Sequence, residues 1–446
     1  MPKKSIRQRM IALLSAALTL VLLLGAPSHT DAAVLKNLSA ARSKYGVSTA
    51  NTITAKTPAA IQTALQTAGS KATAAKPYIV YAPSGNYTMP SKLTVPSNVI
   101  FVAEDDSVFT PKTASGFTQF FMVRGSLYGG SYDGKNMAYY CLRLENQAFS
   151  GKNGCISNTA VKNSKRAGIV AVGSKCRYGK IQNNTVTHCG NSGISAVEGA
   201  WINIVSGNTC KYNTLAGINL GHSNINIISG NTLIGNTGHG ISTDSDGSGQ
   251  GYCHVHQINN NTIRGNGYNG VYMDSNCFVD TKFYNNKIYS NENNGLGIDD
   301  HAYVRGITKN TISGQASSGI RTYGTKSIAY IGSSNVITGS GTNNITIDQG
   351  GRVNLVGSGN VIKSSKGNGV SVKGGGVFYA AGKNNKIQSN EGFGIRVDGK
   401  STISIKNITF SSNGGYAVKV FRGSKATYSS TNLSTAAGAA NRIYFE

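Results

Sequence analysis

The sequence has few of the residues that build an ordinary packed globule. Its 446 residues include one tryptophan and eight prolines, against 56 glycines. Acidic residues are also scarce, at 18 against 43 lysines and arginines, which gives a formal charge of +25 at pH 7. A positive field of this size attracts polyanions by steering and by counter-ion release. The composition therefore points away from a conventional globular enzyme and towards a repetitive fold with an anionic partner.

Long hydrophobic runs are missing except at the start of the chain. Residues 10–25 form one apolar run, which follows Lys3, Lys4, Arg7 and Arg9 and precedes a short polar segment. This layout is typical of a secretory signal peptide, and the run is short for a membrane span. We therefore expect residues 1–32 to be a cleaved signal peptide and residues 33–446 to form a secreted, extracellular protein without a membrane span. Losing the four cations and Asp31 would leave a mature charge of +22.

Cysteine pairs at metal-binding spacing are also missing. The seven cysteines include no CxxC motif, so a cysteine zinc site is not expected. An odd number cannot all pair within one chain. We interpret them as buried small hydrophobic residues.

An internal repeat dominates the chain. Asparagines recur mostly 23 to 26 residues apart, with one spacing of 30, and most are preceded by an apolar residue three positions back. The series is Asn158, Asn184, Asn208, Asn231, Asn261, Asn286, Asn310, Asn335, Asn360 and Asn385. Such a period indicates a solenoid in which each repeat is one coil. Asn tolerates the left-handed conformation of a tight turn, and its amide can bond the Asn of the next coil.

A glycine series runs in phase with the asparagines. A Gly-apolar pair follows most of them by nine or ten residues, as in Gly240-Ile241, Gly270-Val271 and Gly319-Ile320. The first and third residues after each glycine are mostly apolar, so they are expected to point inward. The second and fourth residues must then point outward.

These patterns predict an all-β protein, a single-stranded right-handed parallel β-helix of about ten or more coils. Thr57-Pro58 has the pattern of a helix N-cap, and residues 59–65 predict a short capping helix before a first strand at residues 78–81. We expect an N-terminal cap region at residues 33–75, coils at 76–416 and a C-terminal cap at 417–446. Capped ends are needed because a single coil cannot bury its own apolar face.

The entry to the repeats resembles a known superfamily. The cap helix, the strand leading into residues 83–87, and the segment at 93–99 are similar to the start of pectate-lyase-like proteins. The repeats resemble the right-handed β-helix of that superfamily along nearly the whole mature chain. The superfamily contains lyases, hydrolases, epimerases, adhesins and phage tailspikes, so the resemblance specifies fold more than activity.

One outward column collects the scarce acidic residues. The fourth residue after the glycine is Asp244, Asp274 and Asp299 in three consecutive coils. Stacked strands lie about 4.8 Å apart, and carboxylates at that spacing repel one another unless a cation or a shared proton intervenes. We therefore predict a Ca²⁺ site or an acid–base site on these three residues. Residues 246–251 insert into the Asp244 coil and are expected to form a cleft wall.

The resemblance implies roles for several of these residues. Lyases of the superfamily pair Asp-bound Ca²⁺ with an Arg or Lys base, a role that Arg321 would fill, whereas its epimerases use Tyr, His and Asp, for which Tyr272, His301 and Asp274 are the candidates. The epimerases' Asp-Pro-His motif is not intact in this chain. The basic residues expected to line the groove are Lys282, Lys287, Arg305, Lys309 and Arg321.

Two further histidine features have plainer interpretations. Gly238-His239-Gly240 resembles a polygalacturonase motif, but His239 occupies the slot held by Asn269 and Asn294 in other coils. We interpret it as a turn residue. His254 and His256 alternate on one strand and share a face, yet no third metal ligand can be assigned from sequence, so they are interpreted as a surface pair.

The sequence thus predicts a secreted, monomeric polysaccharide lyase that acts on an acidic, uronate-containing polysaccharide with the help of Ca²⁺. An acidic polysaccharide or an anionic cell-wall polymer is the expected partner, and secretion makes nucleic acid a poor candidate. Three alternatives stay open. The same fold serves C5-epimerases and glycoside hydrolases, and an adhesin would bind its polymer by charge alone.

Overall fold

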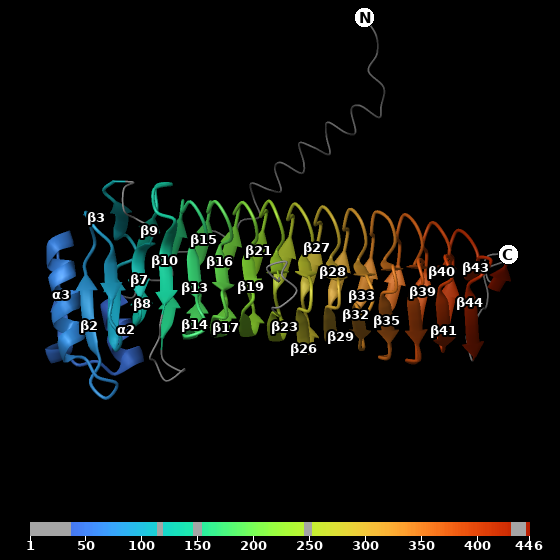
Figure 1. Ribbon diagram of the computed structural model, residues 1–446, viewed down its shortest axis with the longest axis horizontal. Coiled ribbons are helices and arrows are strands. Elements are labelled where there is room, and N and C mark those ends of the chain that lie inside the picture. The colour runs from blue at the N-terminus through green and yellow to red at the C-terminus, as the bar shows by residue number, and fades with distance from the viewer. Residues whose placement is uncertain (1–36, 114–118, 146–153, 245–251, 430–442) are drawn as a thin grey trace, which may run out of the picture.

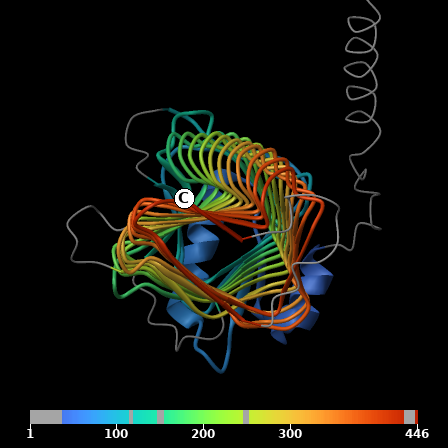
Figure 2. The same ribbon diagram turned by 90° about the vertical axis from the view of Figure 1, so that its right-hand side faces the viewer.

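A computed structural model describes residues 37–113, 119–145, 154–244, 252–429 and 443–446. The chain winds through parallel strands that form three long sheets, here called sheets A, B and C (Figure 1). Each regular coil contributes one strand to sheet C, then one to A, then one to B. Seen end-on, the three sheets form the sides of a roughly triangular tube (Figure 2). This is the predicted parallel β-helix.

Sheet A contains sixteen strands in consecutive coils. They are β1 (Thr52–Thr54), β2 (Tyr78–Ala82), β5 (Val99–Ala103), β8 (Ser126–Tyr128), β11 (Cys155–Ser157), β14 (Arg177–Gln182), β17 (Trp201–Ser206), β20 (Asn224–Ser229), β23 (His254–Asn259), β26 (Phe278–Tyr284), β29 (Tyr303–Thr308), β32 (Ile328–Ile331), β35 (Arg352–Leu355), β38 (Val377–Ala380), β41 (Thr402–Lys406) and β44 (Lys425–Ser429).

Sheet B contains fourteen shorter strands. They are β3 (Asn86–Met89), β6 (Val108–Pro111), β9 (Ser131–Asp133), β12 (Ala160–Lys162), β15 (Thr185–Thr187), β18 (Thr209–Lys211), β21 (Thr232–Ile234), β24 (Thr262–Arg264), β27 (Lys287–Tyr289), β30 (Thr311–Ser313), β33 (Val336–Thr338), β36 (Val361–Lys363), β39 (Asn385–Gln388) and β42 (Ile408–Ser411).

Sheet C contains fifteen strands and carries the aspartate column. They are β4 (Leu93–Val95), β7 (Gln119–Val123), β10 (Tyr140–Glu145), β13 (Ile169–Val172), β16 (Ile194–Val197), β19 (Ile218–Gly221), β22 (Ile241–Asp244), β25 (Val271–Met273), β28 (Leu296–Asp299), β31 (Ile320–Tyr323), β34 (Ile345–Asp348), β37 (Val370–Val372), β40 (Ile395–Val397), β43 (Val418–Val420) and β45 (Ile443–Phe445).

The helices lie at the N-terminal end (Figure 1). The predicted cap helix is α3 (Pro58–Lys71), which begins at the N-cap Thr57, whose hydroxyl accepts a hydrogen bond from the amide of Ala60. Its face of Ile61 and Leu65 packs into the main core, so it closes the end of the tube. A further helix that the sequence did not predict, α2 (Asn37–Tyr45), packs through Ala41 against the outer side of sheet A.

The coils extend beyond the predicted boundaries. A 3₁₀ turn at Thr49–Asn51 leads into β1, which pairs with β2, so the strands begin inside the region predicted to be the N-terminal cap. At the other end β43 and β44 continue sheets C and A past Ala417, and β45 pairs with β43. The predicted signal peptide at 1–32 lies outside the described residues. No helix in the described part of the chain is long and apolar enough to cross a membrane.

The predicted asparagine ladder is present and continuous. The side-chain amide of Asn261 donates to Asn286 Oδ1 at 3.0 Å, and its own Oδ1 accepts from Asn231 at 3.0 Å. The same bond links each pair of neighbours from Asn184 to Asn385. The ladder position before Asn184 is Thr159, whose hydroxyl donates to Asn184 Oδ1, and the predicted Asn158 lies one residue earlier.

The sequence analysis placed the left-handed conformation at the ladder asparagine. In the structure the residue before the ladder asparagine adopts it instead. Gly207, Asn260 and Ser334 take φ values of 64°, 57° and 61°, and each precedes a ladder Asn. The ladder asparagines themselves are buried, because their side chains turn inward to bond the coils above and below. In each turn, one residue therefore adopts the left-handed backbone conformation, and the next residue supplies the side chain of the ladder.

The interior is a single apolar stack. The first and third residues after each repeat glycine point inward as predicted, and Ile241, Val271, Met273 and Ile298 are fully buried. Glycine is required at these turns because a Cβ on Gly240 would lie 2.5 Å from the carbonyl oxygen of Gly270. All seven cysteines are buried, which confirms their interpretation as buried small hydrophobic residues.

Candidate functional site

The aspartate column lies on the outer face of sheet C. Asp299 ends β28, and Asp274 directly follows β25, the strand of the preceding coil. In the parallel register Tyr272 faces Gly297, Gly297 faces Arg321, and Asp299 faces Tyr323. Tyr272, Gly297 and Arg321 therefore form a second outward column beside the aspartates.

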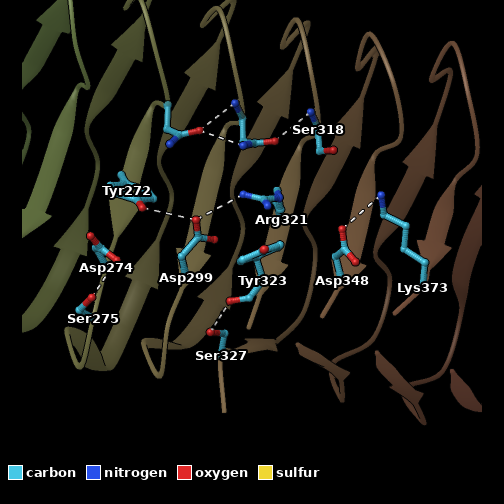
Figure 3. A network of polar contacts seen from close by, with 12 residues as sticks. Tyr272, Asp274, Ser275, Asp299, Ser318, Arg321, Tyr323, Ser327, Asp348 and Lys373 are labelled. Carbon is cyan, nitrogen blue, oxygen red and sulfur yellow. Dashed lines mark hydrogen bonds and ion pairs between the residues drawn. The ribbon is translucent and has the colours of Figure 1, made fainter. Parts of the chain in front are cut away.

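Two side chains from the second column converge on Asp299 (Figure 3). The Tyr272 hydroxyl donates to Asp299 Oδ2 at 3.4 Å, and Arg321 Nη1 lies 3.3 Å from the same oxygen. Gly297 permits this arrangement, since a Cβ there would come within 3.2 Å of the Tyr272 ring. The Arg321 guanidinium also lies over the ring of Tyr323, at 4.4 Å from its centroid. Tyr272, Asp299 and Arg321 thus form a connected triad across three coils.

Burial changes the acidity of Asp299. Only 12% of its side chain is exposed, and its Oδ1 is buried without a hydrogen-bond partner among the described residues. Burial raises the pKa of Asp299 to about 6, and the charges of Asp274 and Asp300 add to this rise while Arg321 opposes it. A carboxyl group with this pKa exchanges its proton near neutral pH, as an acid–base group must.

Tyr272 is held in its protonated form. Burial raises the pKa of its phenol above the usual range, and the charges of Asp299 and Asp274 raise it further. A phenolate next to two carboxylates is unfavourable, so Tyr272 is suited to donate a proton and not to remove one.

His239 joins the site against the sequence interpretation. Its ring stacks on that of Tyr272 with a centroid distance of 4.8 Å and an interplanar angle of 8°. Burial lowers the pKa of His239 to about 4, so the ring is neutral at physiological pH. Its Nδ1 accepts the backbone N–H of Asn269 at 3.3 Å, which leaves the proton on Nε2. The sequence signals for His239 were the Gly238-His239-Gly240 resemblance to a polygalacturonase motif and a histidine in a slot that other coils fill with Asn or Ser.

A groove of about 510 Å³ leads to the triad along sheet C. It crosses the coils from β10 to β25, and its far end is formed by His239, Tyr272 and Asp274. Arg166 and Glu198 add charges of both signs to its walls. Asp299 and Arg321 lie one and two coils beyond that end. The groove is long enough for several residues of a polymer, and its reactive groups lie together at one end.

The sequence of the chain matches the family model described as "Right handed beta helix region" over residues 146–305 and 318–445. This match covers more than half of the chain. The chain belongs to the right-handed β-helix family. The resemblance to pectate-lyase-like repeat proteins is therefore confirmed at the level of the fold.

Solved structures with the same fold are distant from this β-helix protein. The catalytic unit of a GH87 α-1,3-glucanase from Streptomyces thermodiastaticus is 13% identical, with a TM-score of 0.47, covering 87% of this chain and 67% of that chain. The A-module of the Azotobacter vinelandii mannuronan C-5 epimerase AlgE4 is 13% identical, with a TM-score of 0.37, covering 87% and 96%. The Dettilon tailspike protein is 16% identical, with a TM-score of 0.33, covering 89% and 68%. A search of curated proteins found no match.

The other aspartates in the column of this β-helix protein have simpler surroundings. Asp348 pairs with Lys373 at 3.2 Å, and Asp398 pairs with Arg396 at 2.9 Å. Asp274 has no ion pair among the described residues, and its Oδ1 accepts from the Ser275 hydroxyl at 3.1 Å. Asp274 therefore differs from Asp348 and Asp398, each of which forms an ion pair with a basic residue.

Several predicted site residues do not join this site. His301 lies in the exposed turn after β28, and in the described part of the chain it forms no hydrogen bond or ion pair with Asp299. Lys282 and Arg305 lie on sheet A, Lys287 lies on sheet B, and Lys309 lies in the turn between those sheets, so none lines the groove on sheet C. The Asp244 side chain and the insertion at 246–251 lie outside the described residues.

The described donors fit Ca²⁺ poorly. Calcium prefers six to eight oxygen ligands. Asp299 Oδ2 already faces the positive charge of Arg321, and its Oδ1 is buried, which leaves Asp274 as the accessible carboxylate. Of the predicted metal ligands, Asp274 and Asp299 do not by themselves supply the oxygen cage that calcium prefers, and the Asp244 side chain lies outside the described residues. We derive no chemical step from calcium.

The raised pKa of Asp299 predicts a stability effect. Between about pH 4 and pH 6 the folded protein holds a proton on Asp299 that the unfolded chain has released. The free energy of unfolding must then fall as pH rises through this window, by up to about 3 kcal/mol for a shift of two units. Asp299→Asn removes this cost but also removes the ion pair with Arg321. We therefore expect the free energy of unfolding of this variant, measured relative to that of the wild type, to rise by about 1 to 2 kcal/mol between pH 4 and pH 7.

Urea denaturation of both proteins across this pH range measures the difference. Asp348→Asn is the matched control, because it occupies the same column and pairs with Lys373, and it should show no such gain. A constant loss of stability in Asp299→Asn at every pH would contradict the raised pKa.

Proposed function

We propose that this protein is a carbohydrate-active enzyme that binds an acidic polysaccharide along sheet C and cleaves it by β-elimination next to a uronate carboxylate. The observation that carries the proposal is the triad of Tyr272, Asp299 and Arg321 beside Asp274 at the end of the groove. We further propose that the protein is secreted, because the basic N-terminus and the apolar run at residues 10–25 have the layout of a signal peptide. The formal charge of +25 on the full chain favours a polyanion over a neutral glycan.

Arg321 is proposed to bind the uronate carboxylate. Its side chain is 29% exposed, and its guanidinium is paired with Asp299. A guanidinium has no acceptor atom and stays protonated in proteins, so a neutralising role suits Arg321 better than the role of a base. Neutralising the carboxylate makes the adjacent C–H more acidic. The entry of a substrate anion would also favour a proton on Asp299.

Asp274 and Tyr272 are proposed to complete the elimination. Asp274 lines the groove and takes the proton from the carbon next to the carboxylate. The electron pair of that C–H bond forms the double bond as the glycosidic C–O bond breaks, and the leaving oxygen takes the proton of Tyr272. Asp299, hydrogen-bonded to Tyr272 and with a pKa of about 6, then returns a proton to the phenol. The Nε2–H of His239 is available as a donor to the sugar.

Glycoside hydrolysis is the second candidate. A carboxyl with a raised pKa next to an ionised carboxylate is also the pair that glycosidases use. Asp299 and Asp274 on adjacent coils supply these two groups, and the products distinguish the reactions because hydrolysis leaves no unsaturated sugar. Epimerisation would share the first step, and a pure adhesin would need neither carboxylate.

Discrimination between charged and esterified substrate tests the role of Arg321. We expect the wild type to cleave de-esterified pectate or alginate in preference to the methyl-esterified polymer. Arg321→Gln should lower kcat/KM on the charged polymer roughly 10- to 100-fold, since a charge-assisted hydrogen bond contributes about 1.5–3 kcal/mol, and should change the ester little. The measurement is the rate at which unsaturated ends or reducing ends form.

Arg396→Gln is the matched control. Arg396 is also the second residue after a repeat glycine, lies on the same face three coils further on, and pairs with Asp398. Its replacement should leave the preference for charged polymer unchanged. Equal losses on the charged and esterified polymers in Arg321→Gln would count against carboxylate recognition at this position.

A further inference from the structure

A second cluster of functional side chains lies on the outer face of sheet A, away from the groove. His254 and His256 belong to β23, and Asp280 belongs to β26, the neighbouring strand. His254 Nε2 lies 2.8 Å from Asp280 Oδ2, and His256 Nδ1 lies 2.8 Å from Asp280 Oδ1. The structure thus supplies the third residue that the sequence left unassigned.

A β-bulge brings these residues together. Val255 pairs with Val279, but Gln257 pairs with Lys282, so His256 faces two residues of β26, Asp280 and Thr281. The preceding pair, β20 with β23, keeps a straight register. A bulge bends its strand and re-aims a side chain, and bulges are common next to functional sites. The extra residue turns Asp280 towards both histidines.

The neighbouring residues hold the cluster in place. The Thr281 hydroxyl donates to Asp280 Oδ1 at 3.0 Å. The His254 ring packs on Phe278 with a centroid distance of 4.9 Å, and Phe278 stacks on Tyr303 at 5.0 Å. Supports of this kind orient metal ligands in proteins.

The donor set matches a particular class of ion. One ligand atom from each residue lies within 4.8 Å of the others, and in the described part of the chain no other three His, Cys, Asp or Glu residues meet this condition. Two imidazoles and one carboxylate suit zinc and related first-row metals, in contrast to the all-oxygen sets of calcium. The three side chains are 34%, 41% and 30% exposed, so an ion would keep a position open to solvent.

We propose that His254, His256 and Asp280 form a binding site for a divalent transition-metal ion of the zinc class. The ion takes the place of the hydrogen bonds between the histidines and Asp280, which requires small rotations of exposed side chains. This proposal is independent of the reaction on sheet C, because the site lies on another face of the tube.

Equilibrium dialysis of the metal-free full chain against Zn²⁺ alone, followed by metal analysis, tests the site. We expect the wild type to bind one Zn²⁺ per chain, and Asp280→Asn and His256→Gln to bind it at least about 10-fold more weakly. His188→Gln is the control, because it removes a histidine that lies in another coil and packs against Tyr212, and it should bind like the wild type. The seven cysteines are buried and should not compete while the chain is folded.

Substitution with Co²⁺ gives a readout that does not depend on variants. A site with two imidazoles and one carboxylate should give visible absorption bands of four- or five-coordinate intensity in the wild-type protein. Absence of such bands, or equal zinc binding by the wild type and Asp280→Asn, would overturn the proposal and leave the cluster as a hydrogen-bonded surface network.

Discussion

Replacement of Asp274 by asparagine is expected to lower the turnover of acidic polysaccharide by about 10²- to 10⁴-fold, the usual contribution of a general base. The substitution keeps the shape of the side chain and its contact with Ser275, but it removes the proton acceptor that lines the groove. Binding of the polymer should persist, since Arg321 and the basic surface are unchanged. Initial rates of bond cleavage beside a retention assay on the immobilised polymer measure both quantities.

Asp348→Asn serves as the control for Asp274→Asn. Asp348 lies in the same outward column three coils further on, where Lys373 neutralises it. This variant should retain the wild-type rate within about twofold, as surface substitutions away from functional features usually have small effects. If the two variants lose activity equally, the aspartates of this column contribute to the solubility or the charge of the outer face of sheet C, and Asp274 is not the general base.

Replacement of Asn261 by alanine is expected to lower the free energy of unfolding by about 3 to 5 kcal/mol, because it breaks four buried hydrogen bonds at once. The side-chain amide of Asn261 donates to Ile228 O and to Asn286 Oδ1. Its Oδ1 accepts from the backbone N–H and from the side-chain amide of Asn231. Buried donors and acceptors left without partners cost more than the bonds themselves contribute. Urea denaturation followed by far-ultraviolet circular dichroism measures the loss.

Asn226→Ala is the comparison for Asn261→Ala. Asn226 lies on the outer side of β20, and among the described residues its side chain makes one hydrogen bond, to Asn203 at 3.0 Å. Its replacement should cost less than about 1 kcal/mol. Similar losses in both variants would mean that the buried ladder contributes no more than a partly buried amide pair on the outer face of sheet A.

The fold could be predicted because the same sequence pattern recurs in each coil. The period, the inward positions and the bonded asparagine ladder all follow from residue spacing, and the structure confirms them. The ladder was placed one residue off at Asn158, because the left-handed residue and the ladder residue are adjacent and Asn is accepted at both. A second ladder through Asn213, Asn236 and Asn266 was not recognised, since later coils replace Asn with Gln or Ser.

For the site, the sequence predicted only which residues share the outer face of sheet C. Counting from the repeat glycines placed Tyr272, Asp274, Asp299 and Arg321 on the same side of sheet C, since alternation along a strand is sufficient for that purpose. Counting positions after each glycine does not predict contacts that depend on how far a side chain extends. The stacking of His239 on Tyr272 joins rings from neighbouring coils, and the bulge that aims Asp280 leaves no simple mark in the repeat.

The predicted polymer-binding cations show the same limit. Lys282, Lys287, Arg305 and Lys309 are close in sequence to the aspartates, yet a coil passes through three faces within about two dozen residues. They lie on sheets A and B or in the turn between them, where Arg305 packs against Tyr303 and Lys309 against Tyr284. Proximity in sequence is therefore a poor guide to the face that a side chain occupies in a solenoid.

Proton NMR of pectate and alginate after incubation with the wild-type protein or with Asp274→Asn tests the central claim most directly. The proposed elimination predicts new signals of unsaturated sugar ends with the wild type, on at least one of these polymers, and none with Asp274→Asn. Unchanged spectra with the wild type beside clear binding of the polymer, or identical products from both proteins, would contradict an elimination that depends on the sheet C site.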